Sequence, residues 1–248
     1  MLCLRFSKGV FAVLRTFFFY LFFFPWTLIA TCLALLVSPF GQDKMHFFIR
    51  FWGRSCLFLA GLKVQVQGVK NIPHEGSAIY VSNHQSNFDI PIIFTGLPIQ
   101  FRWMAKQEMF RIPLFGLAMK LGGLIPIDRS NQRTTIHSII AAARRIKEGA
   151  SVVIFPEGTR TPDGQLQKFK KGALLIAAKA QVPIVPIVIH GSYQVQPKDR
   201  WKINGSLLKM EILPPIATAG LKSKDIDILT NKVHEQIAHR LQGATTDA

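Results

Sequence analysis

The chain has 248 residues, of which 49% are hydrophobic and only 18% charged, and its formal net charge is +16. A basic and apolar chain favours an anionic membrane surface, an anionic substrate or nucleic acid as its partner. Because the basic residues are scattered and no zinc-finger, ribonucleoprotein or helix-turn-helix pattern occurs, we expect no nucleic acid partner. The three cysteines show no CxxC spacing, so the sequence supports neither a disulfide framework nor a structural zinc site.

An uncharged apolar run occupies residues 16–39, near the start of the chain. Its length exceeds the roughly 20 residues that a helix needs to cross a bilayer. It is too long for a cleaved signal peptide, and no small-residue cleavage site follows it. Pro25 lies inside the run and predicts a kink or a break there. Lys and Arg flank both ends with little asymmetry, so two arrangements stay open: one kinked span, or a helical pair that dips into one leaflet and returns.

A second apolar and aromatic segment follows at residues 45–62 and carries Arg50 and Arg54, which are four apart and share one helical face. A basic face opposite an aromatic one is typical of a helix in the headgroup region. The alternative is a helix that packs on a globular domain. We expect residues 1–62 to form an N-terminal hydrophobic helical membrane-anchoring motif and residues 63–248 to form a separate domain.

From residue 63 onward, predicted strands alternate with predicted helices. Alternation or short apolar runs predict strands at residues 63–67, 77–81, 124–127, 151–155, 182–189 and 207–213. Helical patterns fall between them, and an amphipathic helix at 225–241 closes the chain. This order predicts an α/β fold with a mostly parallel central sheet flanked by helices. Pro183 and Pro186 favour an edge or irregular position for the strand at 182–189.

Three polar clusters directly follow predicted strands, at residues 83–89, 128–129 and 156–160. In open α/β sheets, ligands bind beyond the carboxyl ends of the strands. We therefore expect these clusters to share one crevice.

The first cluster holds His84 and Asp89, five positions apart. On one ideal helix these side chains would point about 140° away from each other. They can meet if His84 lies on a loop and Asp89 lies in the first turn of the next helix, where Pro91 fits well. A carboxylate bound to one imidazole nitrogen fixes the tautomer and leaves the other nitrogen to take a proton. The alternative is that Asp89 only caps the helix and His84 bonds to backbone.

The other two clusters supply groups that suit an anionic substrate. The guanidinium groups of Arg129 and Arg160 can bind phosphate in a bidentate manner. Gly158 allows a close backbone approach and could offer its N–H to an oxyanion, and Lys106 could add a point charge. Alternatively, Arg129 pairs with a neighbouring acid at the surface, and Glu157 caps a turn.

The sequence lacks the motifs and nucleophiles that several other catalytic chemistries require. There is no GxSxG motif, no cysteine in the globular part, and no HExxH or Walker motif. What remains is a histidine base, a carboxylate that orients it and several cations. This set suits a reaction in which a hydroxyl of a phosphate-bearing substrate loses its proton to His84 and attacks an acyl carbonyl.

The ordered motifs resemble the glycerolipid acyltransferases of the 1-acyl-glycerol-3-phosphate acyltransferase type. The resemblance covers about residues 65 to 190. It rests on Asn83-His84 with Asp89, Ile-Pro-Ile-Asp-Arg at 125–129, Phe-Pro-Glu-Gly-Thr-Arg at 155–160 and Val-Pro-Ile-Val-Pro at 182–186, with further matches at 105–108, 113–116 and 169–173. One departure is Pro126, where the family usually has a bulkier apolar residue.

The resemblance implies roles for individual residues. It implies that His84 is the general base and that Asp89 orients it. It implies that the acceptor's phosphate and glycerol are bound by Lys106, Arg129, Glu157, Gly158, Thr159 and Arg160.

The resemblance also implies the reaction, its co-substrate and its place in the cell. Lysophosphatidic acid would be acylated to phosphatidic acid at a membrane, with the catalytic domain on the cytoplasmic face. The donor would be an acyl thioester of coenzyme A or of acyl carrier protein, attacked directly, with no acyl-enzyme, metal or further cofactor. Both carriers are acidic, in agreement with the net charge of +16. The alternatives are an acyltransferase of the same fold that acts on another lyso-lipid, and a non-enzymatic lipid-binding protein at the membrane.

Overall fold

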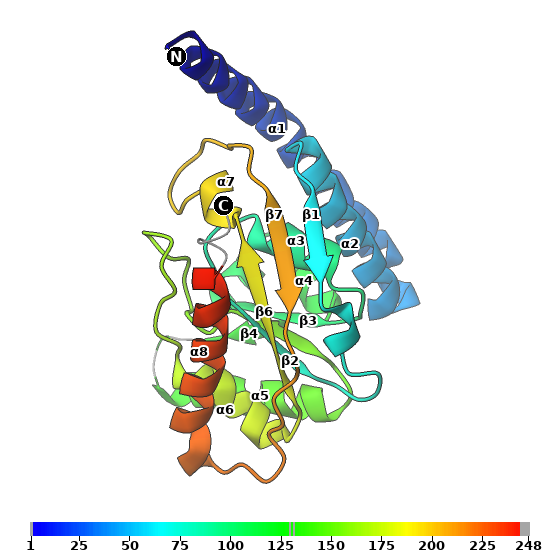
Figure 1. Cartoon of the computed structure of the whole chain (residues 1–248). Helices are drawn as coiled ribbons and strands as arrows, with labels where there is room; N and C mark the ends of the chain where they lie inside the picture. Colours follow the sequence, from blue (N-terminus) through cyan, green and yellow to red (C-terminus); the bar gives the residue numbers. More distant parts are fainter. Residues whose placement is uncertain (1, 129, 131, 244–248) are drawn as a thin grey trace.

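The computed structural model describes residues 2–128, 130 and 132–243, and it contains a central sheet that follows two long N-terminal helices (Figure 1). The sheet has seven strands in the order β1-β7-β6-β2-β5-β3-β4. Their bounds are β1 (Val64–Gln67), β2 (Ile79–Ser82), β3 (Arg102–Lys106), β4 (Ile125–Ile127), β5 (Val152–Ile154), β6 (Ile184–His190) and β7 (Leu208–Ile212). Neighbouring described strands run parallel except for β6 and β7, so the predicted α/β fold with a mostly parallel sheet is confirmed.

Helices cover both faces of this sheet. Their bounds are α1 (Leu2–Val37), α2 (Gln42–Leu59), α3 (Asp89–Gly96), α4 (Phe115–Leu121), α5 (Gln132–Lys147), α6 (Lys171–Ala180), α7 (Ser192–Val195) and α8 (Ile226–Gly243). Short 3-10 helices lie at η1 (Ser38–Phe40), η2 (Val69–Asn71), η3 (Gln107–Arg111) and η4 (Ser223–Asp225).

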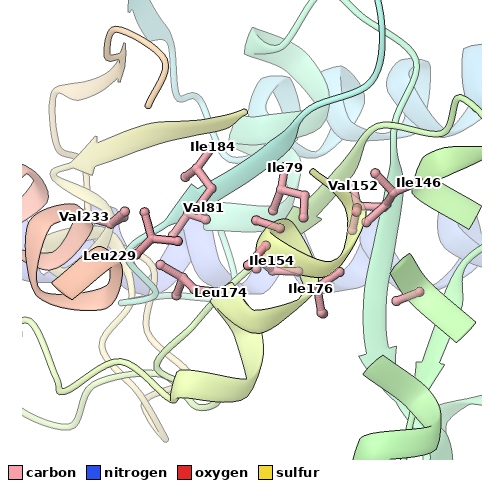
Figure 2. Packing of buried hydrophobic residues seen from close by; sticks show 14 of the residues in the cluster. Ile79, Val81, Ile146, Val152, Ile154, Leu174, Ile176, Ile184, Leu229 and Val233 are labelled. Atoms are coloured by element: carbon pink, nitrogen blue, oxygen red, sulfur yellow. The ribbon is translucent and has the colours of Figure 1, made fainter. Parts of the chain in front are cut away.

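The strands at the centre of the sheet are apolar on both faces because both faces are covered. On one face, Val81 of β2 and Ile154 of β5 belong to a buried cluster with Leu174 of α6 and Val233 of α8 (Figure 2). On the other face, alternate residues of the same strands, such as Tyr80, join a second cluster that includes side chains from α1, α2 and α3. The sheet therefore holds α1 and α2 against the same body that carries the polar loops.

Of the edge or irregular position predicted for the strand with two prolines, the structure shows the irregular one. β6 lies inside the sheet, between β7 and β2. Pro183 precedes the strand. The ladder between β6 and β7 ends at Ile212, and the next contact between the two segments is the bridge from Ile184 to Ile216. Pro186 lies opposite the interval between these two contacts. The missing N–H of Pro186 thus falls where the β6–β7 ladder is already interrupted, which makes the proline tolerable there.

Helix α1 continues through Pro25, so the predicted break is absent. Contacts with α2 on both sides of the proline support the continuous helix. The Trp52 indole N–H donates to Thr27 Oγ1 at 3.0 Å, and the Trp52 ring lies 6.4 Å from the Phe23 ring. The stretch Val10–Phe40 is long and apolar enough to cross a membrane, by length and composition.

Helix α2 packs on the globular body, which is one of the two arrangements that its sequence left open. It packs on α3 so closely that a Cβ placed on Gly53 would lie 2.9 Å from Phe94 Cβ. At the same time, Phe47, Phe51 and Phe58 are exposed. Together with the exposed aromatic residues of α1, these side chains give the helical pair an uncovered apolar surface.

Candidate active site

The loop after β2 is fixed at its start by Asn83. The Asn83 side chain is fully buried, donates through Nδ2 to the Ile189 carbonyl at 2.9 Å, and accepts at Oδ1 from the Ile189 N–H at 2.8 Å. This pair of bonds joins the loop to β6, the neighbouring strand. The position of the next residue, His84, is therefore set by the sheet.

His84 and Asp89 are in direct contact, as the sequence predicted. Helix α3 begins at Asp89, and His84 Nδ1 lies 2.8 Å from Asp89 Oδ2. The N–H groups of Gln85 and Ser86 donate to the same oxygen at 2.7 and 2.8 Å. Because the carboxylate can only accept, Nδ1 carries the ring proton and Nε2 is the nitrogen that can take another.

The imidazole plane is fixed by an aromatic ring from the neighbouring strand end. Phe155, directly after β5, stacks on His84 with a centroid distance of 3.8 Å and an interplanar angle of 3°. Trp103 of β3 contacts Phe155 in turn, at 5.1 Å. Three adjacent strands thus contribute to the orientation of one histidine.

Glu157 binds the backbone N–H of His84 and does not line the cavity beside the imidazole. Its carboxylate accepts from the His84 N–H at 2.7 Å and from the Gln167 N–H at 3.1 Å, and the residue is 3% exposed. Burial raises the pKa of the Glu157 carboxyl to about 7. The nearby charge of Asp89 also raises this pKa, whereas the two N–H donors lower it.

A large cavity opens beside the imidazole. Its volume is about 730 Å³. Its lining includes His84 and the polar side chains of Asn87, Lys106, Thr159, Arg160 and Lys170, together with Gly158. Most of the remaining wall is apolar and comes from α1, α2, α4, α5 and α6, through side chains such as Trp52, Met119 and Ile176. This combination suits a ligand with a charged head and a long apolar chain.

Comparisons with known proteins fit this geometry. An acyltransferase family model matches residues 63–190. The 1-acyl-sn-glycerol-3-phosphate acyltransferase alpha of Bos taurus is 32% identical over 236 residues, which cover 94% of this chain and 82% of that protein. The chain belongs to the acyltransferase family.

Two chloroplastic relatives are longer proteins than this chain. The 1-acyl-sn-glycerol-3-phosphate acyltransferase LPAT1 of Arabidopsis thaliana is 35% identical over 84% of this chain and 57% of its own length. BAT2 of Brassica napus, with the same activity in its name, is 37% identical over 66% of this chain and 47% of its own length. The chain therefore spans about half the length of these two proteins.

A solved structure shares the fold across nearly the whole chain. It is the crystal structure of the 1-acyl-sn-glycerophosphate acyltransferase PlsC from Thermotoga maritima, with a TM-score of 0.82 and 27% sequence identity. The match covers 96% of this chain and 98% of the other. The resemblance drawn from the motifs is thus confirmed at the level of family and fold.

Two of the three predicted polar clusters of this acyltransferase meet directly, through the bond between His84 and Glu157. In the third cluster, Asp128 accepts from the Ser130 N–H at 2.8 Å, next to the start of α5, and Ile127, the strand residue directly before this cluster, lines the cavity. Arg129 lies outside the residues that the structure describes.

The sequence suggested that the Gly158 N–H could bind a substrate oxyanion, but in the structure this N–H has another partner. This N–H donates to the Phe155 carbonyl at 3.1 Å, within a turn in which Gly158 has φ +78°. The left-handed backbone explains why glycine occupies this position. Since the N–H is bonded inside the turn, it is not directed at an oxyanion, although Gly158 itself does line the cavity.

Two contacts of the site had no signal in the sequence. Arg160 Nη2 lies 3.8 Å from Asp199 Oδ1, on the loop after α7. Asn87 lines the cavity and donates to Gln196 Oε1 at 3.4 Å. Asp199 lies about 40 residues after Arg160, and Gln196 lies about 110 residues after Asn87. Only the folded structure brings these partners to the site.

The raised pKa of Glu157 predicts a pH-dependent stability. Because the folded-state pKa lies above the ordinary 4.5, the folded protein binds more protons between pH 4.5 and about 7, and the free energy of unfolding falls as pH rises through this window. A shift of this size corresponds to about 3 kcal/mol. We expect the Tm of the wild type to fall by several degrees relative to Glu157→Gln between pH 5 and pH 8.

The measurement is thermal unfolding in detergent across this pH range. Glu148→Gln is the matched control, since Glu148 is exposed and pairs with Arg144 at the surface. Parallel Tm curves for the wild type and Glu157→Gln would contradict the prediction.

Proposed function

We propose that this chain transfers an acyl group from an acyl thioester of acyl carrier protein or coenzyme A to the sn-2 hydroxyl of lysophosphatidic acid, giving phosphatidic acid. The observation that carries the proposal is the His84–Asp89 pair at the polar part of a large apolar cavity. The names of the relatives, 1-acyl-sn-glycerol-3-phosphate acyltransferase, support the same reaction.

In the proposed mechanism His84 is the general base and Asp89 orients it. Nε2 removes the proton of the acceptor hydroxyl as its oxygen attacks the thioester carbonyl, and the carboxylate of Asp89 stabilises the imidazolium that forms. The C–S bond then breaks, the new ester bond remains, and the imidazolium returns the proton to the departing thiolate. The attack is direct, so no acyl-enzyme and no metal ion takes part. Phe155 and Glu157 keep the histidine in position during these steps.

The acceptor's phosphate would bind where the cationic side chains enter the cavity. Lys106, Thr159 and Arg160 line this part of the wall together with His84. The Arg160 side chain is about one quarter exposed, and the carboxylate of Asp199 lies 3.8 Å from its Nη2. A phosphate dianion is a stronger partner for a guanidinium than this exposed carboxylate. Arg129 belongs to the same proposal through its family motif, and Glu157 acts through the backbone of His84.

Arg160→Ala should weaken acceptor binding more than it slows the chemical step. Losing a charged hydrogen-bond partner should raise the acceptor KM by roughly 10–100-fold, with kcat changed much less. Steady-state kinetics with lysophosphatidic acid as the varied substrate measures both. Arg144→Ala, at an exposed arginine of α5, is the matched control. An unchanged acceptor KM in Arg160→Ala would remove this residue from the proposed phosphate site.

The apolar part of the cavity would hold the acyl chain, so filling it should change chain-length preference. Ala118 of α4 lines the cavity. In Ala118→Phe, we expect turnover of long-chain substrates to fall relative to short-chain ones by roughly tenfold or more, because several methylenes lose their place. Competition between donors of different length measures the ratio. Ala141→Phe, at an exposed position of α5, serves as control. Equal losses for short and long chains would argue against this use of the cavity.

The proposal divides the chain into two working parts. Residues 1–62 would anchor the protein in the bilayer through the exposed apolar side chains of α1 and α2. Residues 63–248 would carry out the reaction on the cytoplasmic face.

The decisive experiment for the function is thioester release across a panel of lyso-lipids, with and without the phosphate on the acceptor. We expect lysophosphatidic acid to give the highest kcat/KM and its dephosphorylated form to be a poor acceptor. A preference for another lyso-lipid would identify an acyltransferase of the same fold with a different acceptor. A protein that binds lysolipids but transfers no acyl chain from either thioester would be a lipid-binding protein, and the proposed function would be wrong.

A further inference from the structure

The loop after α7 displays a basic turn with an exposed tryptophan. This turn, residues 197–202, is called the Trp201 turn below; it carries Lys198, Arg200 and Lys202 around Trp201. The Trp201 side chain is 61% exposed. Among the described residues that follow α2, every other exposed large hydrophobic side chain is aliphatic or a methionine. In Figure 1 the turn belongs to the loop that leaves α7 and leads into β7.

The Trp201 turn is an ordered part of the fold. The Arg200 N–H donates to the Pro197 carbonyl at 3.2 Å, and Gln196 Nε2 donates to the Trp201 carbonyl at 3.4 Å. Ile203, directly after the turn, is fully buried. The indole is therefore presented on a fixed backbone, and little conformational entropy remains to be lost when it binds a partner.

The residues on either side of the Trp201 turn are hydrogen-bonded to α1, close to the start of its uncharged run. The Ile203 N–H donates to Thr16 Oγ1 at 2.9 Å, and Gln196 Nε2 donates to the Tyr20 hydroxyl at 2.8 Å. Arg15 lies against Gly205, where an added Cβ would be 2.8 Å from its Nη1. Arg15 is the last charged residue before the uncharged run that begins at Thr16. For a helix seated in a bilayer, this is the depth of the headgroups.

The turn is also attached to the candidate active site. Its one acidic residue, Asp199, has φ +60° and directs its carboxylate toward Arg160, at 3.8 Å. With the Asp199 side chain 77% exposed, three cations, one carboxylate and an indole share the same short segment, which keeps a positive net charge. This is the combination that favours the interface of an anionic bilayer, since tryptophan prefers the headgroup level and Lys and Arg are attracted by anionic lipids.

We propose that the Trp201 turn is a second membrane contact, which binds the headgroup layer of an anionic bilayer and holds that layer beside Arg160. The apolar surface of α1 and α2 supplies the embedded part of the anchor, and this turn fixes how the rest of the body sits on the surface. The contact does not depend on acyl transfer, so its test is separate from the test of the proposed function.

The first test places Trp201 relative to the lipid. The full chain is reconstituted into vesicles that contain phosphatidylglycerol and phosphatidylcholine brominated either near the headgroup or near the chain end. We expect Trp201→Phe to lose part of the bromine-quenched fluorescence, and to lose more of it with bromines near the headgroup. Trp103→Phe, at a buried position, is the matched control and should leave the absolute amount of quenched fluorescence unchanged. Identical quenching in the wild type and Trp201→Phe would overturn the proposal.

The second test removes the charges of the turn. The triple variant Lys198→Gln, Arg200→Gln, Lys202→Gln should lose about tenfold or more of its preference for phosphatidylglycerol vesicles over phosphatidylcholine vesicles, measured by competitive flotation. The control Lys179→Gln, Lys222→Gln, Lys224→Gln removes the same charge at exposed positions of α6 and the segment before α8. Equal losses in both variants would show that only net charge matters and would overturn the proposal. An unchanged lipid preference would do the same, even if turnover with a carrier-bound donor fell, because the turn would then serve an acidic protein.

Discussion

His84→Ala is expected to lower turnover by ~10²–10⁴-fold, since this is the usual contribution of a positioned general base. The acceptor KM should change little, because the phosphate would still meet Arg160 and the acyl chain would still fill the same cavity. The fold should persist, since the ring contributes one stacking contact with Phe155 and one bond to Asp89. Steady-state kinetics and a thermal unfolding curve, both in detergent, measure these two expectations.

His74→Ala is the matched control for this variant, since His74 is an exposed loop residue that precedes β2 and should be neutral. Near-full turnover in His84→Ala would remove the base from the proposed mechanism. A loss of turnover accompanied by a large fall in Tm would show that His84 acts through the structure of the loop.

Asp89→Asn is expected to give the second-largest loss, within the same ~10²–10⁴-fold range but smaller than that of His84→Ala. The amide oxygen can still accept from the N–H groups of Gln85 and Ser86, so the loop keeps its support. What disappears is the negative charge that stabilises the imidazolium during proton transfer. The loss should therefore appear in kcat as well as in kcat/KM.

Asp227→Asn, at an exposed aspartate that pairs with Lys171, is the control for the loss of one carboxylate. If Asp89→Asn kept the turnover of the wild type, Asp89 would only cap α3. In that case the histidine would need another group to orient it.

The pairing of His84 with Asp89 could be predicted because it depends on local chain geometry. A loop residue and the first residue of a helix five positions later meet wherever the chain turns from strand to helix, and Pro91 marks that start. The α/β fold was predictable for a similar reason, since hydrophobic periodicity changes between strand and helix along the chain. Both inferences needed only contacts between neighbours in sequence.

The inferences that failed or were missing depended on distant parts of the chain. The choice between an edge and an irregular position for Pro186 stayed open because its sequence does not reveal that the partner strand is interrupted opposite it. The Gly158 N–H was assigned to a substrate because its bond to the Phe155 carbonyl belongs to a turn whose type the sequence leaves open. The bond from the His84 N–H to Glu157 joins residues 73 positions apart, and no local pattern predicts it.

The cavity wall links the proposed membrane anchor to the proposed acyl site. Thr27, Ala30 and Ala34 of α1 and Phe48 of α2 line the same chamber as His84, while other side chains of these helices are uncovered. If the proposed function holds, a substitution that refits these helices to a thicker or thinner lipid layer would also remodel the room available to the fatty acid. Bilayer thickness and fatty-acid selection would then be coupled through one pair of helices, and a lineage that changed one trait would have to readjust the other.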